Sequence, residues 1–168
     1  TTRPAPCARN YPVRGAPGSL LVADFNGDHR PDLATTVVNG FTGPGGVSVL
    51  LGQDGGVFDR EQVFATGAYP TSLVLADFNR DGRLDLATAN SGSSDVSIRL
   101  GRGYGTVQTQ PAIRVTGNPT LLVVSDFDGD GQHDLATGNF DYFGNTASVS
   151  ILLGRGDGNF DLEPEVQV

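Results

Sequence analysis

The stretch that decides the fold is Asp126-Phe127-Asp128-Gly129-Asp130-Gly131-Gln132-His133-Asp134-Leu135. Close variants of this acidic motif occupy residues 24–33 and 77–86. Every copy has Asp or Asn at positions 1, 3 and 5, and Asp at position 9. This spacing lets a short loop gather oxygen atoms around a hard cation such as calcium. The copies lie 53 and 49 residues apart, so the acidic motif is one part of a larger repeated unit.

Each unit contains the same series of short runs. An apolar run precedes the acidic motif, Asp-Leu-Ala-Thr follows at its end, and a further apolar run begins at Val47, Val96 and Val149. A Gly-rich turn and a more polar run complete the unit. Runs of this length, rich in β-branched and apolar side chains and bounded by Gly, Pro or Asn, predict strands. Four strands in each unit of roughly 50 residues are typical of propeller blades.

The sequence therefore predicts an all-β chain of β-propeller blades with four antiparallel strands each, and three blades in all. The expected segments are an N-terminal leader at 1–12 and blades at 13–64, 65–114 and 115–168. Phe25, Phe78 and Phe127, at position 2 of each motif, are expected to point inward and anchor the loops. Three blades cannot close a ring and would leave two end faces bare. We therefore expect either a fragment of a larger propeller or a homodimer that completes six blades.

The charge of the chain follows from the acidic motifs. The formal net charge is −8, and ten of the 19 carboxylates lie in the three motifs. Three divalent ions would bring the net charge to −2, so the acidity indicates metal sites and does not favour a nucleic-acid partner. No stretch approaches the roughly 18–20 apolar residues that span a bilayer. The chain begins with Thr and lacks an apolar signal segment, so we expect a mature or excised product from which any signal peptide has been removed.

Other acidic and propeller repeats fit less well. An EF-hand requires a bidentate Glu at position 12, where this chain has Thr35, Thr88 and Thr137, and no helical pattern flanks the motifs. The chain has no Trp, which excludes the Trp-Asp pair of WD repeats. Acidic turns without a cation are the remaining alternative, but clustered like charges would repel one another.

The acidic motif, followed by an Ala-Thr strand and by Val-Ser-x-Leu-Leu-Gly-x-Gly-Asp-Gly-x-Phe, resembles the FG-GAP/VCBS repeat family over about residues 11–168. That family includes the calcium-binding propeller blades of integrin α-subunits and many secreted bacterial proteins. The resemblance implies up to three Ca²⁺ ions, each bound by side chains at positions 1, 3, 5 and 9, by the backbone carbonyl of position 7 and by water. The implied ligands are Asp24, Asn26, Asp28, Arg30 and Asp32; Asp77, Asn79, Asp81, Arg83 and Asp85; and Asp126, Asp128, Asp130, Gln132 and Asp134.

The three motifs are not equivalent. Motif three has four carboxylates and Gly at positions 4 and 6, whereas motif two has Asn79 in place of one carboxylate. Motif one has His29 at position 6, where the backbone is expected to need a positive φ. We therefore expect calcium affinity to fall in the order three, two, one. Extracellular calcium modules bind at about 10⁻⁴ to 10⁻³ M, so weak sites would still fill outside a cell.

These features predict a non-catalytic calcium-binding module for recognition or adhesion, secreted or on the cell surface. The connections between the Ala-Thr and Val-Ser strands vary in length, as ligand-binding loops do. Their aromatic residues are candidate contacts with an extracellular protein or carbohydrate: Phe41, Phe140, Tyr142 and Phe143. A propeller lectin that binds carbohydrate between blades is the alternative.

A polysaccharide-active hydrolase is the third and least favoured function. Both histidines, His29 and His133, lie inside acidic motifs at positions that are not ligands. Other carboxylates, such as Asp95, Asp141 and Asp157, carry no spacing that fixes two of them about 5–9 Å apart, as glycoside hydrolysis requires. No catalytic residue is therefore predicted.

Overall fold

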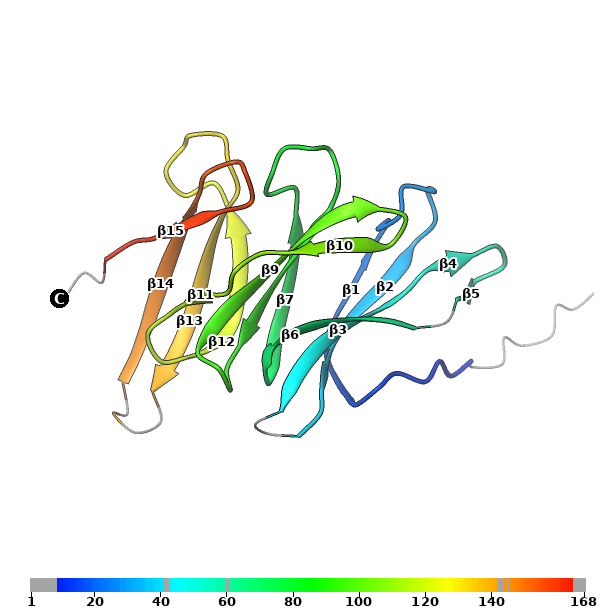
Figure 1. Ribbon diagram of the computed structural model, residues 1–168, viewed down its shortest axis with the longest axis horizontal. Coiled ribbons are helices and arrows are strands. Elements are labelled where there is room, and N and C mark those ends of the chain that lie inside the picture. The colour runs from blue at the N-terminus through cyan, green and yellow to red at the C-terminus, as the bar shows by residue number, and fades with distance from the viewer. Residues whose placement is uncertain (1–8, 41–42, 60, 142–143, 145, 165–168) are drawn as a thin grey trace, which may run out of the picture.

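The computed structural model describes residues 9–40, 43–59, 61–141, 144 and 146–164, and its regular structure there is entirely β-strand (Figure 1). The prediction of an all-β chain is confirmed. Three antiparallel sheets stand side by side, and their first strands are neighbours, with β7 between β1 and β12. Within the described ranges no helix is long and apolar enough to cross a membrane.

The first and third sheets have four strands, as predicted, and the second has a fifth short strand. The first sheet has the order β1 (Ala16–Ala23), β2 (Asp32–Val38), β3 (Pro44–Leu50), β6 (Gln62–Ala68). The second has the order β7 (Pro70–Ala76), β8 (Asp85–Asn90), β9 (Asp95–Gly103), β10 (Thr106–Thr109), with β11 (Ile113–Arg114) also pairing with β9. The third has the order β12 (Asn118–Ser125), β13 (Asp134–Asp141), β14 (Thr146–Gly154), β15 (Phe160–Leu162). A short ribbon, β4 (Gly52–Gln53) with β5 (Val57–Phe58), extends the first sheet's outer turn.

Each acidic motif is the hairpin connection between the first two strands of a sheet. The residue before the motif pairs with the aspartate at position 9: Ala23 with Asp32, Ala76 with Asp85, and Ser125 with Asp134. Because the three sheets have the same register at this point, all three motifs project from one edge of the molecule, the upper edge in Figure 1.

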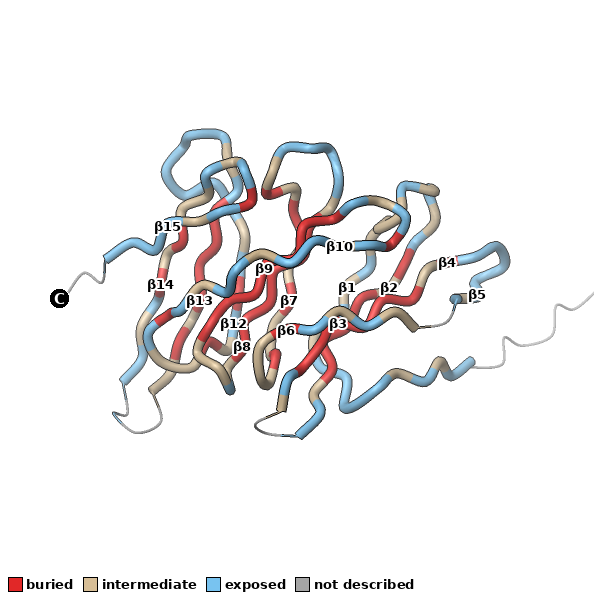
Figure 2. Tube along the Cα trace, viewed as in Figure 1, coloured by how far each residue is buried: buried red, intermediate tan, exposed pale blue. Residues whose placement is uncertain are grey.

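The core lies between the sheets. Side chains alternate across a strand, so Leu73 of β7 packs toward the first sheet while Val74 packs toward the third. Two apolar clusters result, one around Val49 and Leu86 and the other around Ile98, Leu122 and Leu135. Figure 2 shows the buried residues concentrated on the middle strands, whereas β1 and β12 are largely half-buried or exposed.

The phenylalanines at position 2 do not share one environment. Phe78 is buried and meets Phe160 of the third sheet edge-on, with ring centroids 5.4 Å apart. Phe25 is half-buried in the cluster between the first two sheets. Phe127, however, is 47% exposed, so the prediction of an inward position was wrong for this residue. The reason is that the following sheet covers each phenylalanine, and the chain described here has no sheet after the third.

A buried arginine joins the first and second sheets. Arg99 of β9 donates through Nε to the carbonyl of Ala65 in β6 at 2.9 Å, and through Nη1 to the carbonyl of Ile98 at 2.8 Å. Burial lowers the pKa of Arg99, and the negative charge of Asp95 opposes that change. Leu50 and Leu152 occupy this position in the other two repeats, so the polar contact is particular to the second repeat.

A glycine near the end of the third strand allows a close backbone approach in every sheet. A Cβ atom on Gly52, Gly101 or Gly154 would lie 2.2 Å from the carbonyl oxygen of position 8 in the acidic motif. Real contacts of a Cβ with a backbone oxygen are not this short, so only glycine lets the motif pack against the third strand.

We predict that Gly101→Ala lowers the free energy of unfolding by about 2 kcal/mol or more, since the new methyl group would collide with the carbonyl of Leu84. Gly138→Ala is the matched control, because its Cβ would meet only the Cβ of Leu121 at 3.8 Å. Urea denaturation of both variants measures the difference. Equal stability of the two variants would contradict the close-approach explanation.

Candidate metal centre

The aspartate at position 9 ties each motif to the third strand of its sheet. In the second sheet, Oδ2 of Asp85 accepts the N–H of Phe78 at 2.8 Å and Oδ1 accepts the N–H of Gly101 at 2.7 Å. The equivalent pairs in the other sheets measure 2.6 to 2.8 Å. All three carboxylates are 0% exposed. Each oxygen retains a lone pair, so the carboxylate has a structural role in addition to the predicted role as a ligand.

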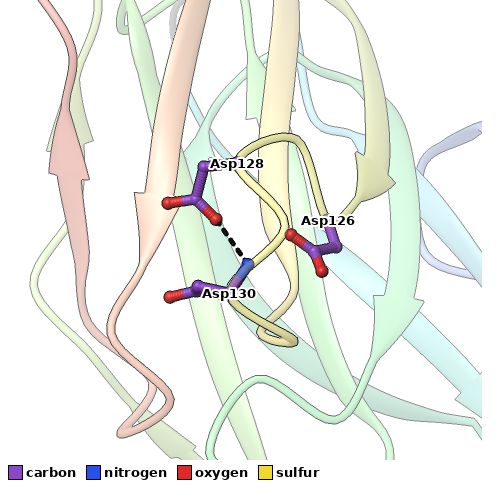
Figure 3. Close-up of side chains that lie close together, drawn as sticks. All are labelled: Asp126, Asp128 and Asp130. Carbon is purple, nitrogen blue, oxygen red and sulfur yellow. Dashed lines mark hydrogen bonds between the residues drawn. The ribbon is translucent and has the colours of Figure 1, made fainter.

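In motif three the side chains at positions 1, 3 and 5 lie close together, and Asp128 bonds to the backbone of Asp130 (Figure 3). Asp126 accepts backbone N–H groups from Gly129 at 2.7 Å and Gly131 at 2.9 Å. Asp128 accepts the N–H of Asp130 at 3.0 Å. Two of these bonds recur in motifs one and two, from the N–H of position 6 to position 1 and from the N–H of position 5 to position 3. The bond from the N–H of position 4 to position 1 recurs in motif one. In motif three these bonds hold the carboxylates of Asp126 and Asp128 close to that of Asp130.

Carboxylates converge most closely in motif three. One ligand atom from each of Asp126, Asp128 and Asp130 lies within 4.8 Å of the others. The backbone N–H of Gly131, and next that of Gly129, hold the pKa of Asp126 below its usual value, so this group stays ionised at neutral pH. Oxygen donors without sulfur or imidazole suit a hard divalent cation. The residues present therefore fit calcium.

Arginines at position 7 distinguish motifs one and two from motif three. Arg30 lies 3.3 Å from the carboxylate of Asp28 and 3.0 Å from that of Asp54. Arg83 lies 3.4 Å from Asp81. A guanidinium beside the position 5 carboxylate offsets part of the negative charge that would attract a cation. Motif three has the uncharged Gln132 there, which adds a reason to expect the tightest binding at that motif.

Backbone strain also differs among the motifs. His29 has φ 65°, as expected for position 6. Position 4 has a positive φ as well, a feature that the sequence reasoning missed, and Arg80 adopts it at 59° in motif two. Motifs one and two thus each hold one non-glycine residue in the left-handed region, whereas motif three has Gly129 and Gly131 at both positions. Such a residue costs about 1–2 kcal/mol.

Arg80 also connects two motifs. Its Nη2 donates to the carbonyl of Gly131 in motif three at 2.9 Å. Sequence alone gave no signal for this contact, because the other two motifs have glycine at position 4.

Of the four candidate ligand-binding aromatics, the described residues include Phe140, which does not lie at the edge that carries the acidic motifs. Phe41, Tyr142 and Phe143 lie outside the described residues. Phe140 is half-buried on β13, opposite Asn118 and Ala147, at the end of the strand away from the acidic motif. Any contact through Phe140 would therefore use the edge opposite the acidic motifs.

A hollow lies at that opposite edge, between the first and second sheets. Its volume is about 420 Å³. The lining consists mainly of small and apolar residues: Ala16, Pro17, Gly18, Val38, Gly40, Tyr69, Pro70 and Thr71. Tyr69 has φ 52°, so a strained residue forms part of the wall.

We predict that His29→Gly raises the free energy of unfolding by about 1 kcal/mol, since it removes a non-glycine residue from the left-handed region. His133→Gly is the control: His133 is also an exposed histidine of a motif, but its φ is not positive, so the added chain entropy should lower stability. Thermal unfolding with a chelator present measures both variants. A loss of stability in both would contradict the strain assigned to position 6.

The pH dependence of the metal-free protein should report on Asp85. Burial raises the pKa of Asp85 from 3.8 to about 6, and the charges of Asp81 and Asp77 add to the increase, against the hydrogen bonds from Gly101 and Phe78. A raised pKa in the folded state favours folding below pH 4, and this contribution is lost as the pH rises through 6. Between pH 5 and 7 the loss should be about 1 kcal/mol.

The Asp85→Asn variant tests this assignment, because the amide does not titrate. Denaturation at pH 5 and pH 7, with chelator present, should show a smaller pH dependence in the variant than in the parent chain. Identical pH dependence would show that Asp85 does not titrate in this range.

Comparison with known families matches the profile of the FG-GAP-like repeat to residues 24–88 and 77–137. Each match begins at position 1 of one motif and ends just after the next motif, and together the matches cover more than half of the chain. A search among curated proteins found no match. The repeated motif, the repeated sheet and the matching profile lead to one conclusion. The chain belongs to the FG-GAP-like repeat family.

Proposed function

We propose that this chain is a non-catalytic, calcium-binding recognition or adhesion module that works outside the cell, with each sheet serving as a propeller blade. The proposed blades are the segments 13–64, 65–114 and 115–168, preceded by a leader at 1–12. The observation that carries the proposal is the convergence of three carboxylates in motif three, together with the equivalent hairpin position of all three acidic motifs at one edge.

The side chains at positions 1, 3, 5 and 9 and the carbonyl of position 7 would hold the ion. Calcium supplies two positive charges that offset the repulsion among the carboxylates of a motif. The chain's own residues fix and orient the ligands. The position 9 carboxylate fixes the loop to the third strand, and backbone N–H groups orient the carboxylates at positions 1, 3 and 5. The family match supports this assignment, because FG-GAP repeats often bind Ca²⁺.

An extracellular setting fits sites of this kind. The motifs are short and exposed at positions 1, 3 and 5 in motif three, and motifs one and two each carry an arginine against a carboxylate. Such sites should bind in the range of about 10⁻⁴ to 10⁻³ M that extracellular calcium modules use.

The edge opposite the motifs is the better candidate for ligand recognition. Its hollow is lined by apolar residues such as Val38 and Pro70, with Thr71 among the few polar ones. Sugars require several placed hydrogen-bonding groups, so this lining favours an apolar segment of a protein ligand over a carbohydrate. The lectin alternative is separated by a screen against immobilised glycans, in which specific retention would favour carbohydrate binding between blades.

We predict that calcium at about ten times its dissociation constant adds about 1.4 kcal/mol of stability per filled site. The melting temperature should therefore rise by several degrees with calcium and return on addition of a chelator. Calorimetric titration should give the tightest binding to motif three. Asp128→Ala should weaken that site, because it removes a carboxylate from the converging group.

Asp157→Ala is the matched control. Asp157 is an exposed carboxylate in the turn between β14 and β15, outside every acidic motif. This variant should titrate like the parent chain. A melting curve that does not respond to calcium in the parent chain would refute the proposed metal sites.

A further inference from the structure

Large apolar side chains are exposed at the two ends of the row of sheets. On the outer face of the first sheet, Leu20 and Val22 are 60% and 62% exposed. On the outer face of the third sheet, Leu121, Val123 and Val149 are 67%, 55% and 65% exposed. Exposed apolar groups gathered on one face indicate an interaction surface.

The same repeat positions are buried inside the row. Val149 corresponds to Val47 and Val96, and both of those are 0% exposed. Leu20 corresponds to Leu73, which is 3% exposed. Position in the row, rather than residue type, therefore decides the exposure. In each internal case, what covers the residue is the neighbouring repeat.

The two end faces are complementary in kind. In the first and second sheets, one face packs against the sheet that follows; Val74 and Val96 lie on this face of the second sheet. The third sheet exposes the equivalent face. The opposite face of the second sheet packs against the first sheet, and Leu73 lies on it. The first sheet exposes its own equivalent of this face. An end face should thus fit the opposite end face, which is a head-to-tail contact.

Residues 11–14 contact the first sheet on the side where a preceding repeat would lie. Tyr11 meets Phe58 edge-on, with ring centroids 5.2 Å apart, and the N–H of Arg14 donates to Glu61 at 2.7 Å. This segment borders a hollow next to Leu50, which corresponds to Arg99. At Arg99 the neighbour is the outer strand of the preceding sheet. By this correspondence, the outer strand of another repeat would pack beside Leu50 of the first sheet.

We propose that two copies of this chain join head to tail, the third sheet of each copy packing on the first sheet of the other. The contact continues the pattern of the internal ones and buries both end faces. Closed propellers usually have four to eight blades, so two copies give a ring of six sheets, whereas three copies would exceed that range.

The mass in solution tests the proposal. Light scattering of the full chain at about 0.1 mM, where micromolar contacts are filled, should give twice the 17.5 kDa mass of one chain. Leu20→Glu and Val149→Asp should each give a monomer. Tyr104→Glu is the control, because Tyr104 is 88% exposed at the tip of the β9–β10 hairpin and should leave the dimer intact.

Mixing the two monomeric variants tests the head-to-tail geometry. Leu20→Glu keeps an intact third sheet and Val149→Asp keeps an intact first sheet, so an equimolar mixture should recover a dimer through one contact. Pairing of like faces predicts instead that each variant still dimerises alone. Circular dichroism checks folding, and Val22→Glu and Leu121→Glu replace any variant that unfolds.

Three results would overturn the proposal. The first is a monomeric parent chain, which would leave the faces to further repeats or to another protein. The second is a dimer that survives both end-face substitutions. The third is a parent chain of higher or mixed mass, which would show that the head-to-tail contact does not close at two copies.

Discussion

The two hydrogen bonds that each buried position 9 aspartate accepts hold a repeat together. One oxygen accepts the N–H of position 2 and the other accepts the N–H of the glycine near the end of the third strand, as Asp85 does with Phe78 and Gly101. A buried carboxylate is tolerated only when its polar atoms are satisfied. The pair of bonds meets that condition and also joins three strands at the base of the loop. The glycine is part of the same constraint, because the carbonyl of position 8 leaves no room for a Cβ atom.

A second constraint acts between repeats. One sheet of four strands has two faces, and the described chain forms its apolar clusters only where one sheet packs against another. The position of a sheet in the row therefore decides what is buried. Phe78 and Phe127 occupy the same motif position, yet one is covered by Phe160 and the other is exposed. Each end face has the residues that form a contact between two internal sheets, but lacks the neighbouring sheet that would cover them.

Charge and backbone strain make the three acidic loops different, although they share most of their hydrogen bonds. Motif three combines four carboxylates with glycine at both left-handed positions. Motifs one and two place an arginine beside Asp28 and Asp81, and each also holds one strained residue, His29 or Arg80. The position 6 strain could be predicted, because a glycine pattern with one exception is visible in the sequence. The position 4 strain was missed, although Gly27 and Gly129 beside Arg80 gave the same kind of signal.

The sequence by itself determined the all-β class, the repeat and the oxygen-rich loops, because strand periodicity and motif spacing act over a few neighbouring residues. It also identified the carboxylates that converge in motif three. Tertiary structure alone decided which atoms those side chains meet. Arg80 reaches Gly131 across 51 residues, and Arg99 replaces a leucine to bind the carbonyl of Ala65 in the preceding sheet. Contacts of this kind depend on how one sheet is set against the next, and a single repeat carries no information about its neighbour's backbone. The exposure of Phe127 and Val149 has the same origin, since burial belongs to a pair of sheets rather than to a residue.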